Sequence, residues 1–441
     1  MQISVIGTGY VGLVSGACFS EFGFDVTCVD KDAEIVARLE RDEIPIYEPG
    51  LDDLVHKNRL AGRLHFTTDL AVSVKDADAV FIAVGTPSRR GDGAADLVYV
   101  ESAAREIAAN LQDFTVIVTK STVPVGTARH IERIVREANP AADFEMASNP
   151  EFLREGSAIE DFMRPDRVIV GVEGERARDI LSRLYRPLSL RDAPVLFTGL
   201  ESAELIKYAG NAFLATKITY INQISDLCES VGANVQDVAK GIGLDGRIGA
   251  KFLHPGPGFG GSCFPKDTRA LSVISREAGA PMSLVDAVVD SNDKRKQAMA
   301  GRIIEALGGD AGGKRIGILG VSFKPNTDDM RESPSLDIIP ELIKAGAQIC
   351  AFDPAAMEKA AGMLPGVDWK DNSYAVAEDA DCLVILTEWN EFRALDLQRL
   401  SVIMKQPVLI DLRNIYTLEE IAPTSFTYHS VGRSTLFPER S

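Results

Sequence analysis

Short apolar runs alternate with longer amphipathic stretches along the first 200 residues. The runs at residues 80–84, 115–119 and 167–171 are rich in valine and isoleucine and end at small or turn-forming residues. Runs of this kind are typical of parallel strands, which are apolar on both faces because helices cover the sheet. We therefore predict a doubly wound α/β sheet, with ligands at the carboxyl ends of its strands.

A long helix is predicted after this sheet. Residues 202–231 contain no proline, and apolar side chains recur there at roughly helical spacing: Leu205, Ala209, Phe213, Ile218 and Ile221. Periodicity over such a length indicates a helix and not a strand. We interpret it as a connecting helix, and we expect a second helical stretch from about residue 281 to residue 307.

The strand pattern begins again after Gly312 and Gly313. Four further apolar runs predict a second α/β sheet: residues 314–320, 347–353, 381–386 and 408–411. The predicted fold class is α/β, with two Rossmann-like doubly wound domains joined by a long central helix. We expect parts at residues 1–200, 201–310 and 311–441. One sheet would bind a cofactor and the other a second nucleotide-like ligand, with the chemistry between them.

The first apolar run leads into a dinucleotide-binding fingerprint. Gly7 allows a tight turn, Gly9 lets the backbone approach a pyrophosphate, and Gly12 lets helix and strand pack closely. Asp30 follows a second strand about 20 residues later, where a carboxylate grips a ribose diol and repels a 2′-phosphate. This context favours NAD over NADP. The alternative is a glycine-rich turn that binds no nucleotide.

Composition narrows the class of protein. The chain has 441 residues, 45% of them hydrophobic and 25% charged, which is ordinary usage for a globular protein of more than one domain. A net charge of −17 disfavours nucleic acid and anionic membranes as partners. No spanning helix or signal peptide is visible, so we expect a cytoplasmic protein. The six cysteines lack CxxC spacing, which favours free thiols, and we predict no metal site.

One cysteine lies in a glycine-rich run. Cys263 is the sixth residue of GFGGSCFPKD, residues 258–267, in a chain that also carries the fingerprint. Removing one hydride from an alcohol needs no covalent bond to the enzyme, whereas oxidation through an aldehyde to an acid needs a group that holds the carbonyl. A thiolate adds to an aldehyde, and the adduct loses a second hydride to become a thioester that water cleaves. The alternative is a buried structural thiol.

Several motifs together resemble the UDP-glucose/GDP-mannose dehydrogenase family, most closely its UDP-glucose branch, almost from end to end. They lie at residues 10–12 (YVG), 44–50 (IPIYEPG), 85–87 (Gly-Thr-Pro), 120–124 (KSTVP), 149–156 (NPEFLREG), 207–211 (KYAGN), 247–258 (RIGAKFLHPGPG), 258–267, 323–324 (FK) and 331–333 (RES). The resemblance implies NAD-dependent, two-step oxidation of UDP-glucose to UDP-glucuronate, which supplies polysaccharide synthesis. It also implies an NAD-binding first domain, a central region for dimerisation and the active site, and a UDP-sugar-binding third domain.

Roles for individual residues follow from the resemblance. Cys263 would be the nucleophile, Lys207 and Asn211 would stabilise the developing oxyanion, and Asp267 and Thr122 would position the attacking water. Glu151 would act as a general acid or base. NAD would contact Gly7, Gly9, Tyr10, Val11, Gly12, Asp30, Thr86, Thr122, Glu155, Lys266 and Arg331. The sugar nucleotide would contact Glu151, Phe152, Leu153, Lys207, Asn211, Arg247, Phe252, Leu253, His254, Pro255, Gly256, Gly260 and Lys324. Arg247 would reach a neighbouring subunit's site or the sugar, which implies a homodimer.

Three alternatives stay open at this point. The same mechanism could act on a UDP-N-acetylhexosamine or on GDP-mannose, because the residues lining the sugar cannot be placed from sequence. A single-step β-hydroxyacid dehydrogenase shares the Rossmann opening and the long helix, but it uses a lysine and needs no cysteine. A non-enzymatic NAD sensor would not need Cys263, Lys207, Asn211 and Asp267 together.

Overall fold

The computed structural model describes residues 1–89, 91, 93–190 and 193–438. It divides into two compact units. One comprises Met1–Gly210 with Val273–Ala280, and the other comprises Asn211–Ser272 with Pro281–Ser441. The three-part division at residues 200 and 310 stays a prediction.

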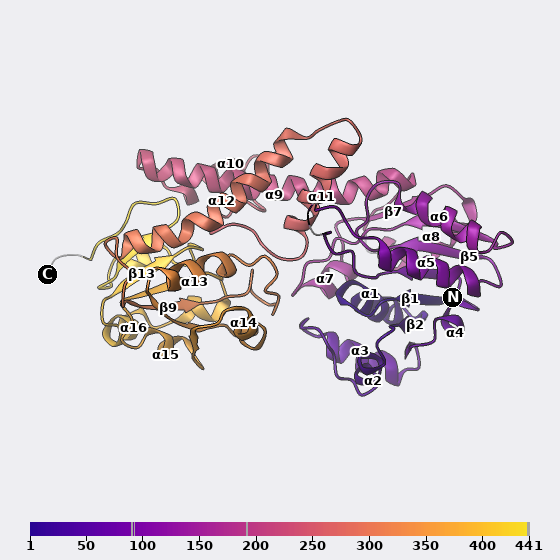
Figure 1. Ribbon diagram of the computed structural model, residues 1–441, viewed down its shortest axis with the longest axis horizontal. Coiled ribbons are helices and arrows are strands. Elements are labelled where there is room, and N and C mark those ends of the chain that lie inside the picture. The colour runs from indigo at the N-terminus through magenta and orange to yellow at the C-terminus, as the bar shows by residue number, and fades with distance from the viewer. Residues whose placement is uncertain (90, 92, 191–192, 439–441) are drawn as a thin grey trace. The chain divides into compact units, whose positions relative to one another are not determined.

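The first unit is built on an eight-stranded sheet of order β3-β2-β1-β4-β5-β6-β7-β8 (Figure 1). Its strands are β1 (Gln2–Ile6), β2 (Asp25–Val29), β3 (Leu64–Thr67), β4 (Ala79–Ile82), β5 (Thr115–Thr119), β6 (Phe144–Ser148), β7 (Val168–Val172) and β8 (Val195–Thr198). Each predicted run of this region is a strand. The expectation that all are parallel is wrong at one place, because β7 runs antiparallel to β6 and starts a parallel pair with β8.

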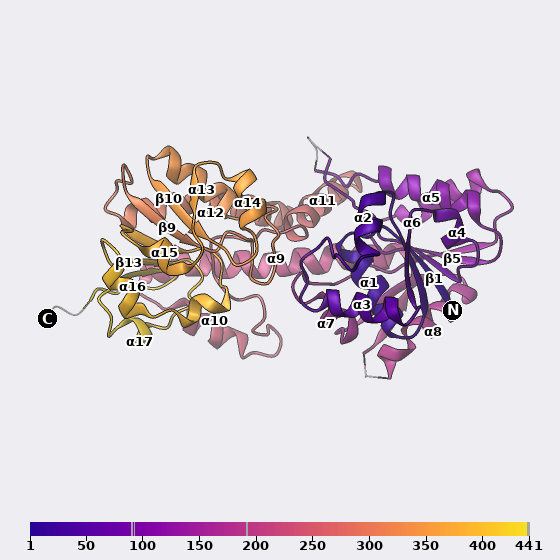
Figure 2. The same ribbon diagram turned by 90° about the horizontal axis from the view of Figure 1, so that it is seen from below.

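Helices cover both faces of this sheet. One face packs against α1 (Tyr10–Glu21), α2 (Ala33–Leu39), α3 (Leu51–Leu60), α7 (Ala158–Met163) and α8 (Glu175–Ser189). The other packs against α4 (Leu70–Val74), α5 (Val98–Asn110) and α6 (Thr127–Ala138), and Figure 2 shows α5 and α6 across the strands from α1 and α3. Within β4, Phe81 joins the first core and Val80 the second. Successive side chains of this strand thus point to opposite faces of the sheet, and both faces are buried under helices.

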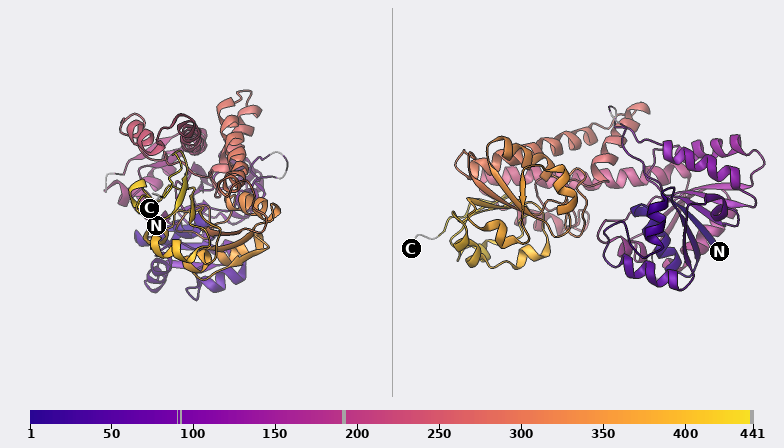
Figure 3. Two further views of the ribbon diagram at one scale, coloured as in Figure 1. Left: turned by 90° about the vertical axis from the view of Figure 1, so that its left-hand side faces the viewer. Right: turned by 60° about the horizontal axis from the view of Figure 1, so that its bottom comes forward.

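The second unit contains a six-stranded, fully parallel sheet of order β11-β10-β9-β12-β13-β14. Its strands are β9 (Arg315–Leu319), β10 (Gln348–Phe352), β11 (Val367–Trp369), β12 (Cys382–Ile385), β13 (Val408–Asp411) and β14 (Thr427–Ser430), coloured orange to yellow in Figure 3. The helices after β9 are α13 (Ser335–Lys344), α14 (Met357–Met363), α15 (Ser373–Ala377), α16 (Leu397–Ile403) and α17 (Leu418–Ile421). All four predicted runs are strands, so the predicted fold class of two doubly wound sheets is confirmed.

Four helices lie between the two sheets in sequence. They are α9 (Leu200–Val231), α10 (Val235–Gly243), α11 (Phe264–Glu277) and α12 (Ser283–Ala306). The predicted long helix is α9, with 32 residues, and the predicted second helix is α12. The boundary between the two units falls inside α9, after Gly210. None of the helices in the described ranges is long and apolar enough to cross a membrane. The cytoplasmic location stays a prediction.

Candidate active site

The fingerprint lies between β1 and α1. Gly7 has φ +102°, a backbone conformation that side chains rarely adopt, and a Cβ on Gly12 would lie 1.9 Å from the carbonyl oxygen of Gly7. No atom lies within 4 Å of the position that a Cβ on Gly9 would take. The turn and the first turn of α1 therefore require glycine, while the backbone at Gly9 stays open to a ligand. This geometry fits a pyrophosphate at the start of α1.

Asp30 directly follows β2 and is held by the fingerprint. Its Oδ2 accepts hydrogen bonds from the backbone N of Thr8 at 2.9 Å and from Thr8 Oγ1 at 2.6 Å, and its Oδ1 accepts one from the N of Asp32. These bonds orient the carboxylate beside the glycine-rich turn. A carboxylate in this place suits the ribose hydroxyls of a dinucleotide.

Tyr10 is anchored to a carboxylate that sequence reasoning did not assign a role. The Tyr10 hydroxyl donates to Glu48, and Glu48 also accepts hydrogen bonds from the backbone N of Gly156 at 2.6 Å and of Ala158 at 2.8 Å. Burial and Glu48 together raise the pKa of Tyr10. Glu48 thereby ties the fingerprint to residues 156–158. Glu48 lies in the motif at residues 44–50, but the sequence did not reveal its partners, because they are up to 110 residues away.

Two predicted residues meet in the loops after β4 and β5. The hydroxyl of Thr86 donates to the backbone oxygen of Thr122 at 3.0 Å, and Ser121 Oγ donates to Val84 O at 2.6 Å. The loops that carry Thr86 and Thr122 are thus fixed to each other at the carboxyl edge of the sheet, where ligands bind in this fold.

Lys207 and Glu151 form a buried ion pair in the first unit. Lys207 Nζ lies 3.0 Å from Glu151 Oε1, and their side chains are only 3% and 6% exposed. The ammonium also lies 5.3 Å from the ring centre of Phe152. The ammonium and the carboxylate could exchange a proton with a substrate or stabilise a charge on it. The structure therefore brings together three predicted residues from two separate motifs.

Cys263 lies in the second unit, directly before α11. The thiol is partly exposed, and its Sγ lies 3.5 Å from Ser262 Oγ. The other five cysteines are buried. Burial raises the pKa of each of these five thiols, and Cys263 is therefore the cysteine placed to react.

The glycine-rich loop before Cys263 is closely packed. A Cβ on Gly260 would lie 2.2 Å from the carbonyl oxygen of Glu332, and the N of Gly261 donates to Arg331 O at 2.8 Å. On the other side, Asn292 of α12 exchanges two hydrogen bonds with the backbone of Phe259, at 2.8 and 3.0 Å. Asn292 was not predicted, because 33 residues separate it from the loop.

Asp267 lies in the first turn of α11, is 1% exposed, and joins two other predicted residues. Its Oδ2 accepts from Asn211 Nδ2 at 2.6 Å, its Oδ1 lies 2.6 Å from Lys266 Nζ, and its backbone N donates to Cys263 O. The carboxylate is thus fixed one turn beyond the thiol. Asn211 lies four residues after Lys207 on α9, so the two share a helix face as predicted.

Other predicted residues have side-chain or backbone partners outside the set of Cys263, Asp267, Asn211 and Lys266. Arg247 is 89% exposed in its side chain and pairs with Asp245, while Arg331 pairs with Asp329. The backbone of Gly256 is held between Asn222 and Arg295, Leu253 is buried, and Lys324 Nζ lies 5.4 Å from the ring centre of Phe323. The ligand contacts proposed for these residues stay predictions.

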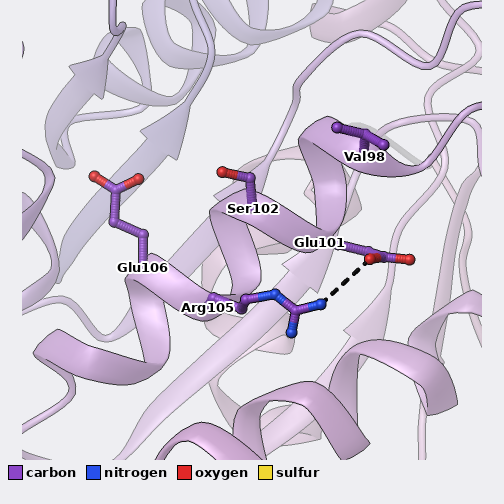
Figure 4. A pocket seen from close by; sticks show the side chains of 5 residues that line it. All are labelled: Val98, Glu101, Ser102, Arg105 and Glu106. Carbon is purple, nitrogen blue, oxygen red and sulfur yellow. Dashed lines mark hydrogen bonds and ion pairs between the residues drawn. The ribbon is translucent and has the colours of Figure 1, made fainter.

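A hollow on the outer side of α5 involves none of the predicted residues. Its walls are Val98, Glu101, Ser102, Arg105 and Glu106, and Figure 4 shows the ion pair between Glu101 and Arg105 there. Lys31, next to Asp30 in sequence, reaches Ser102 and Glu106. Within the described residues there is no cluster of three metal-binding side chains either.

Sequence reasoning also missed two buried charged groups near the predicted residues. Glu204 of α9 accepts hydrogen bonds from the N of Gly126 at 2.6 Å and of Ala128 at 2.8 Å, and burial raises its pKa to about 7. Lys120, directly after β5, is 4% exposed and donates to Asn149 Oδ1 at 3.0 Å. Their partners are 76 and 29 residues away in sequence, so no local pattern reveals them.

We expect the burial of Lys120 to make the stability of the protein depend on pH. Burial lowers the pKa of Lys120 from 10.5 to about 8, so between these pH values the unfolded chain binds more protons than the folded one. Stability must then rise with pH across this window. Urea denaturation at pH 8 and at pH 10.5 measures this effect. Between these pH values, we expect the free energy of unfolding of the wild type to rise by on the order of 3 kcal/mol relative to that of Lys120→Met. A difference that does not change with pH would contradict this.

Comparison with known proteins agrees with this arrangement. Three models of the UDP-glucose/GDP-mannose dehydrogenase family match the chain: the NAD binding domain at residues 1–189, the central domain at 201–294 and the UDP binding domain at 317–418. A UDP-glucose 6-dehydrogenase of Rhizobium meliloti (strain 1021) is 60% identical over 435 residues, covering 98% of this chain and 100% of the relative.

Solved structures of related dehydrogenases have the same fold as this chain. A UDP-glucose dehydrogenase from Pyrobaculum islandicum has a TM-score of 0.90 and 38% identity, with 98% of each chain covered. A UDP-D-ManNAc dehydrogenase from Pyrococcus horikoshii has a TM-score of 0.86 and 27% identity, with 98% of this chain and 99% of that chain covered. Fold and site thus define an NAD-dependent oxidoreductase. The chain belongs to the UDP-glucose/GDP-mannose dehydrogenase family.

Proposed function

We propose that the protein oxidises UDP-glucose to UDP-glucuronate, consuming two NAD and one water, and so supplies polysaccharide synthesis. The observation that carries this proposal is the partly exposed thiol of Cys263 one helical turn before the buried carboxylate of Asp267. A simple alcohol dehydrogenase has no use for a nucleophile next to a fixed base. The identity of 60% to a UDP-glucose 6-dehydrogenase supports the choice of sugar nucleotide.

The first oxidation converts the C6 alcohol to an aldehyde. NAD, when bound, accepts the hydride of each oxidation. The alcohol proton must leave as the carbonyl forms, and the buried pair of Lys207 and Glu151 offers a carboxylate to receive it and an ammonium to stabilise the oxygen. Asn211 would add an amide donor from the next turn of α9.

The second oxidation requires the thiol. Cys263 Sγ adds to the aldehyde carbon, and the proton passes to the carbonyl oxygen, which gives a thiohemiacetal. Loss of the C6 hydride and the hydroxyl proton turns this adduct into a thioester. Asp267, with Thr122, would take a proton from the water that attacks the thioester, which releases the carboxylate product and restores the thiol.

The substrate's diphosphate needs local cations, because the protein carries a net charge of −17. We assign this role to Lys324, with the backbone of residues 252–256 holding the uridine. The contacts of NAD with Lys266 and Arg331 and the sugar contact of Arg247 are part of the same proposal, and they follow from the family's motifs.

A second sugar nucleotide is the strongest rival substrate. The family includes GDP-mannose dehydrogenases, and the solved UDP-D-ManNAc dehydrogenase has the same fold. We expect kcat/KM for UDP-glucose to exceed that for UDP-N-acetylglucosamine and for GDP-mannose by at least about 100-fold, since an N-acetyl group or a purine must find its own buried polar partners. Activity on one of these rivals and not on UDP-glucose would refute UDP-glucose as the substrate but would leave the proposed mechanism unchanged.

We also propose that the protein works as a homodimer through α9. Phe213, Tyr220 and Leu227 recur every seventh residue on this helix, and Val231 follows one turn later; all four are more than half exposed. Heptad spacing of exposed apolar residues is typical of a helix that packs on another helix. We expect a dimer in light scattering, and a monomer for the Phe213→Glu, Leu227→Glu double variant. A wild-type monomer at micromolar concentration would exclude the dimer.

A further inference from the structure

Lys120 is a buried lysine to which the proposed reaction gives no task. It lies at the carboxyl end of β5, next to the loop of Thr122, and its side chain is 4% exposed. Its Nζ donates to Asn149 Oδ1 at 3.0 Å and lies 5.8 Å from the ring centre of Phe162. Burying an ammonium is costly, so a lysine kept in this place must be stabilised by its surroundings.

Asn149 is fixed from every side. Its backbone N donates to Thr119 O at 2.9 Å, its Nδ2 donates to Ile169 O at 2.7 Å, and its Oδ1 accepts from both Lys120 and the hydroxyl of Tyr185. The strands β5 and β7 and the helix α8 therefore hold this residue. Because Pro150 follows with a restricted φ, the path of the backbone to Glu151 is determined.

Lys120 also changes the charge around Glu151. The buried carboxylate of Glu151 has the Lys207 ammonium at 3.0 Å, and it interacts electrostatically with Lys120 as well. The pKa of Lys120, lowered to about 8 by burial, still leaves the ammonium charged at pH 7. Two positive charges thus face one negative charge in a buried region. Other titratable groups near Lys120 are Cys18 of α1 and, through Asn149, Tyr185 of α8, and Asp161 and Arg167 line the same small cavity as Lys120.

We propose that Lys120 is a positioning residue for the reaction at Glu151: it fixes the segment from Asn149 to Glu151 and places a second positive charge near the carboxylate that pairs with Lys207. The proposal rests on the proposed function, because it gives Glu151 and Lys207 their part in the oxidation. An excess of one positive charge also favours an oxyanion in the transition state.

The test compares Lys120→Met with Tyr185→Phe. Both remove one hydrogen bond to the same side-chain oxygen of Asn149, but only Lys120→Met also removes a charge and a second, 3.5 Å hydrogen bond to the backbone oxygen of Asn149. We expect Lys120→Met to lower kcat for UDP-glucose roughly 10- to 100-fold. Its pH–rate profile should move about one unit toward alkaline pH, because groups near a lost positive charge hold their protons more tightly. Tyr185→Phe should leave the pH profile in place, and Lys120→Arg should restore most of kcat.

The outcomes separate the possible failures. If Lys120→Met has the kcat and pH profile of the wild type, Lys120 does not have the proposed role. The same conclusion follows if Lys120→Met and Tyr185→Phe lose the same fraction of kcat and have the same pH profile. If Lys120→Met does not fold, Lys120→Gln replaces it, since it keeps a donor for Asn149; if neither folds, Lys120 is structural and the proposal fails. A wild type that oxidises no UDP-glucose would instead refute the proposed function.

Discussion

Replacing Cys263 by serine is expected to lower kcat for the conversion of UDP-glucose to UDP-glucuronate by at least about 10⁴-fold. A serine hydroxyl is ionised far less readily than a thiol and forms an ester in place of the more reactive thioester. The variant should still bind NAD, because the exchange changes one atom of one side chain and leaves the fingerprint and Asp30 intact. Steady-state NADH formation with isothermal titration of NAD measures both effects.

Cys228→Ala is the matched control for this experiment. Cys228 lies in the same unit, on α9, and is buried in an apolar cluster with Ile221 and Val235. Its loss should reduce the melting temperature but change kcat by less than about threefold. Activity of Cys263→Ser within tenfold of the wild type would mean that Cys263 is not the nucleophile.

Asp267→Asn should convert steady turnover into a burst. The carboxylate accepts from Asn211 and pairs with Lys266, and it is proposed to activate the water that cleaves the thioester. An amide cannot take that proton, so hydrolysis should slow by about 10²- to 10³-fold while the hydride transfers stay faster. Stopped-flow absorbance should then show about two NADH per active site at once, followed by a slow steady rate.

Lys266→Met tests whether this effect belongs to the carboxylate. It removes the same ion pair but leaves Asp267 to accept from Asn211. We expect no burst in this variant, but a higher KM for NAD. A burst in both variants would assign the effect to the ion pair, and a steady-state rate of Asp267→Asn near that of the wild type would remove Asp267 from the hydrolysis step.

The fold could be predicted largely from local pattern, because most strands are buried on both faces. Val116, Ile117 and Val118 of β5 are fully buried. Because the strand is buried on both faces, its sequence is a continuous apolar run that can be recognised without the structure. Among the described residues, five strands were not predicted: β3, β6, β8, β11 and β14. β11 has only three residues, and Thr427–Ser430 of β14 forms no apolar run. The reversed direction of β7 could not be predicted either, because strand direction depends on the connection and not on composition.

The proximity of candidate site residues could be predicted only where they lie within one motif. Cys263 and Asp267 share a motif, and Lys207 and Asn211 share a helix face. The contact between Asn211 and Asp267 joins residues 56 positions apart, and no local pattern encodes it. No local pattern encodes the contact of Lys120 with Asn149 either, since Lys120 appeared in the sequence only as the first residue of the motif at residues 120–124. Asn211 and Asp267 meet where helices α9 and α11 contact each other, whereas Lys120 and Asn149 meet because the parallel strands β5 and β6 end at one edge of the sheet.

The most direct test of the two-step mechanism is the amount of NADH formed per UDP-glucose consumed by the wild type, with the reaction run to completion. The covalent mechanism predicts two NADH per UDP-glucose and UDP-glucuronate as the product, with no free aldehyde. One NADH per UDP-glucose, with an aldehyde accumulating, would contradict it and leave Cys263 without a catalytic task.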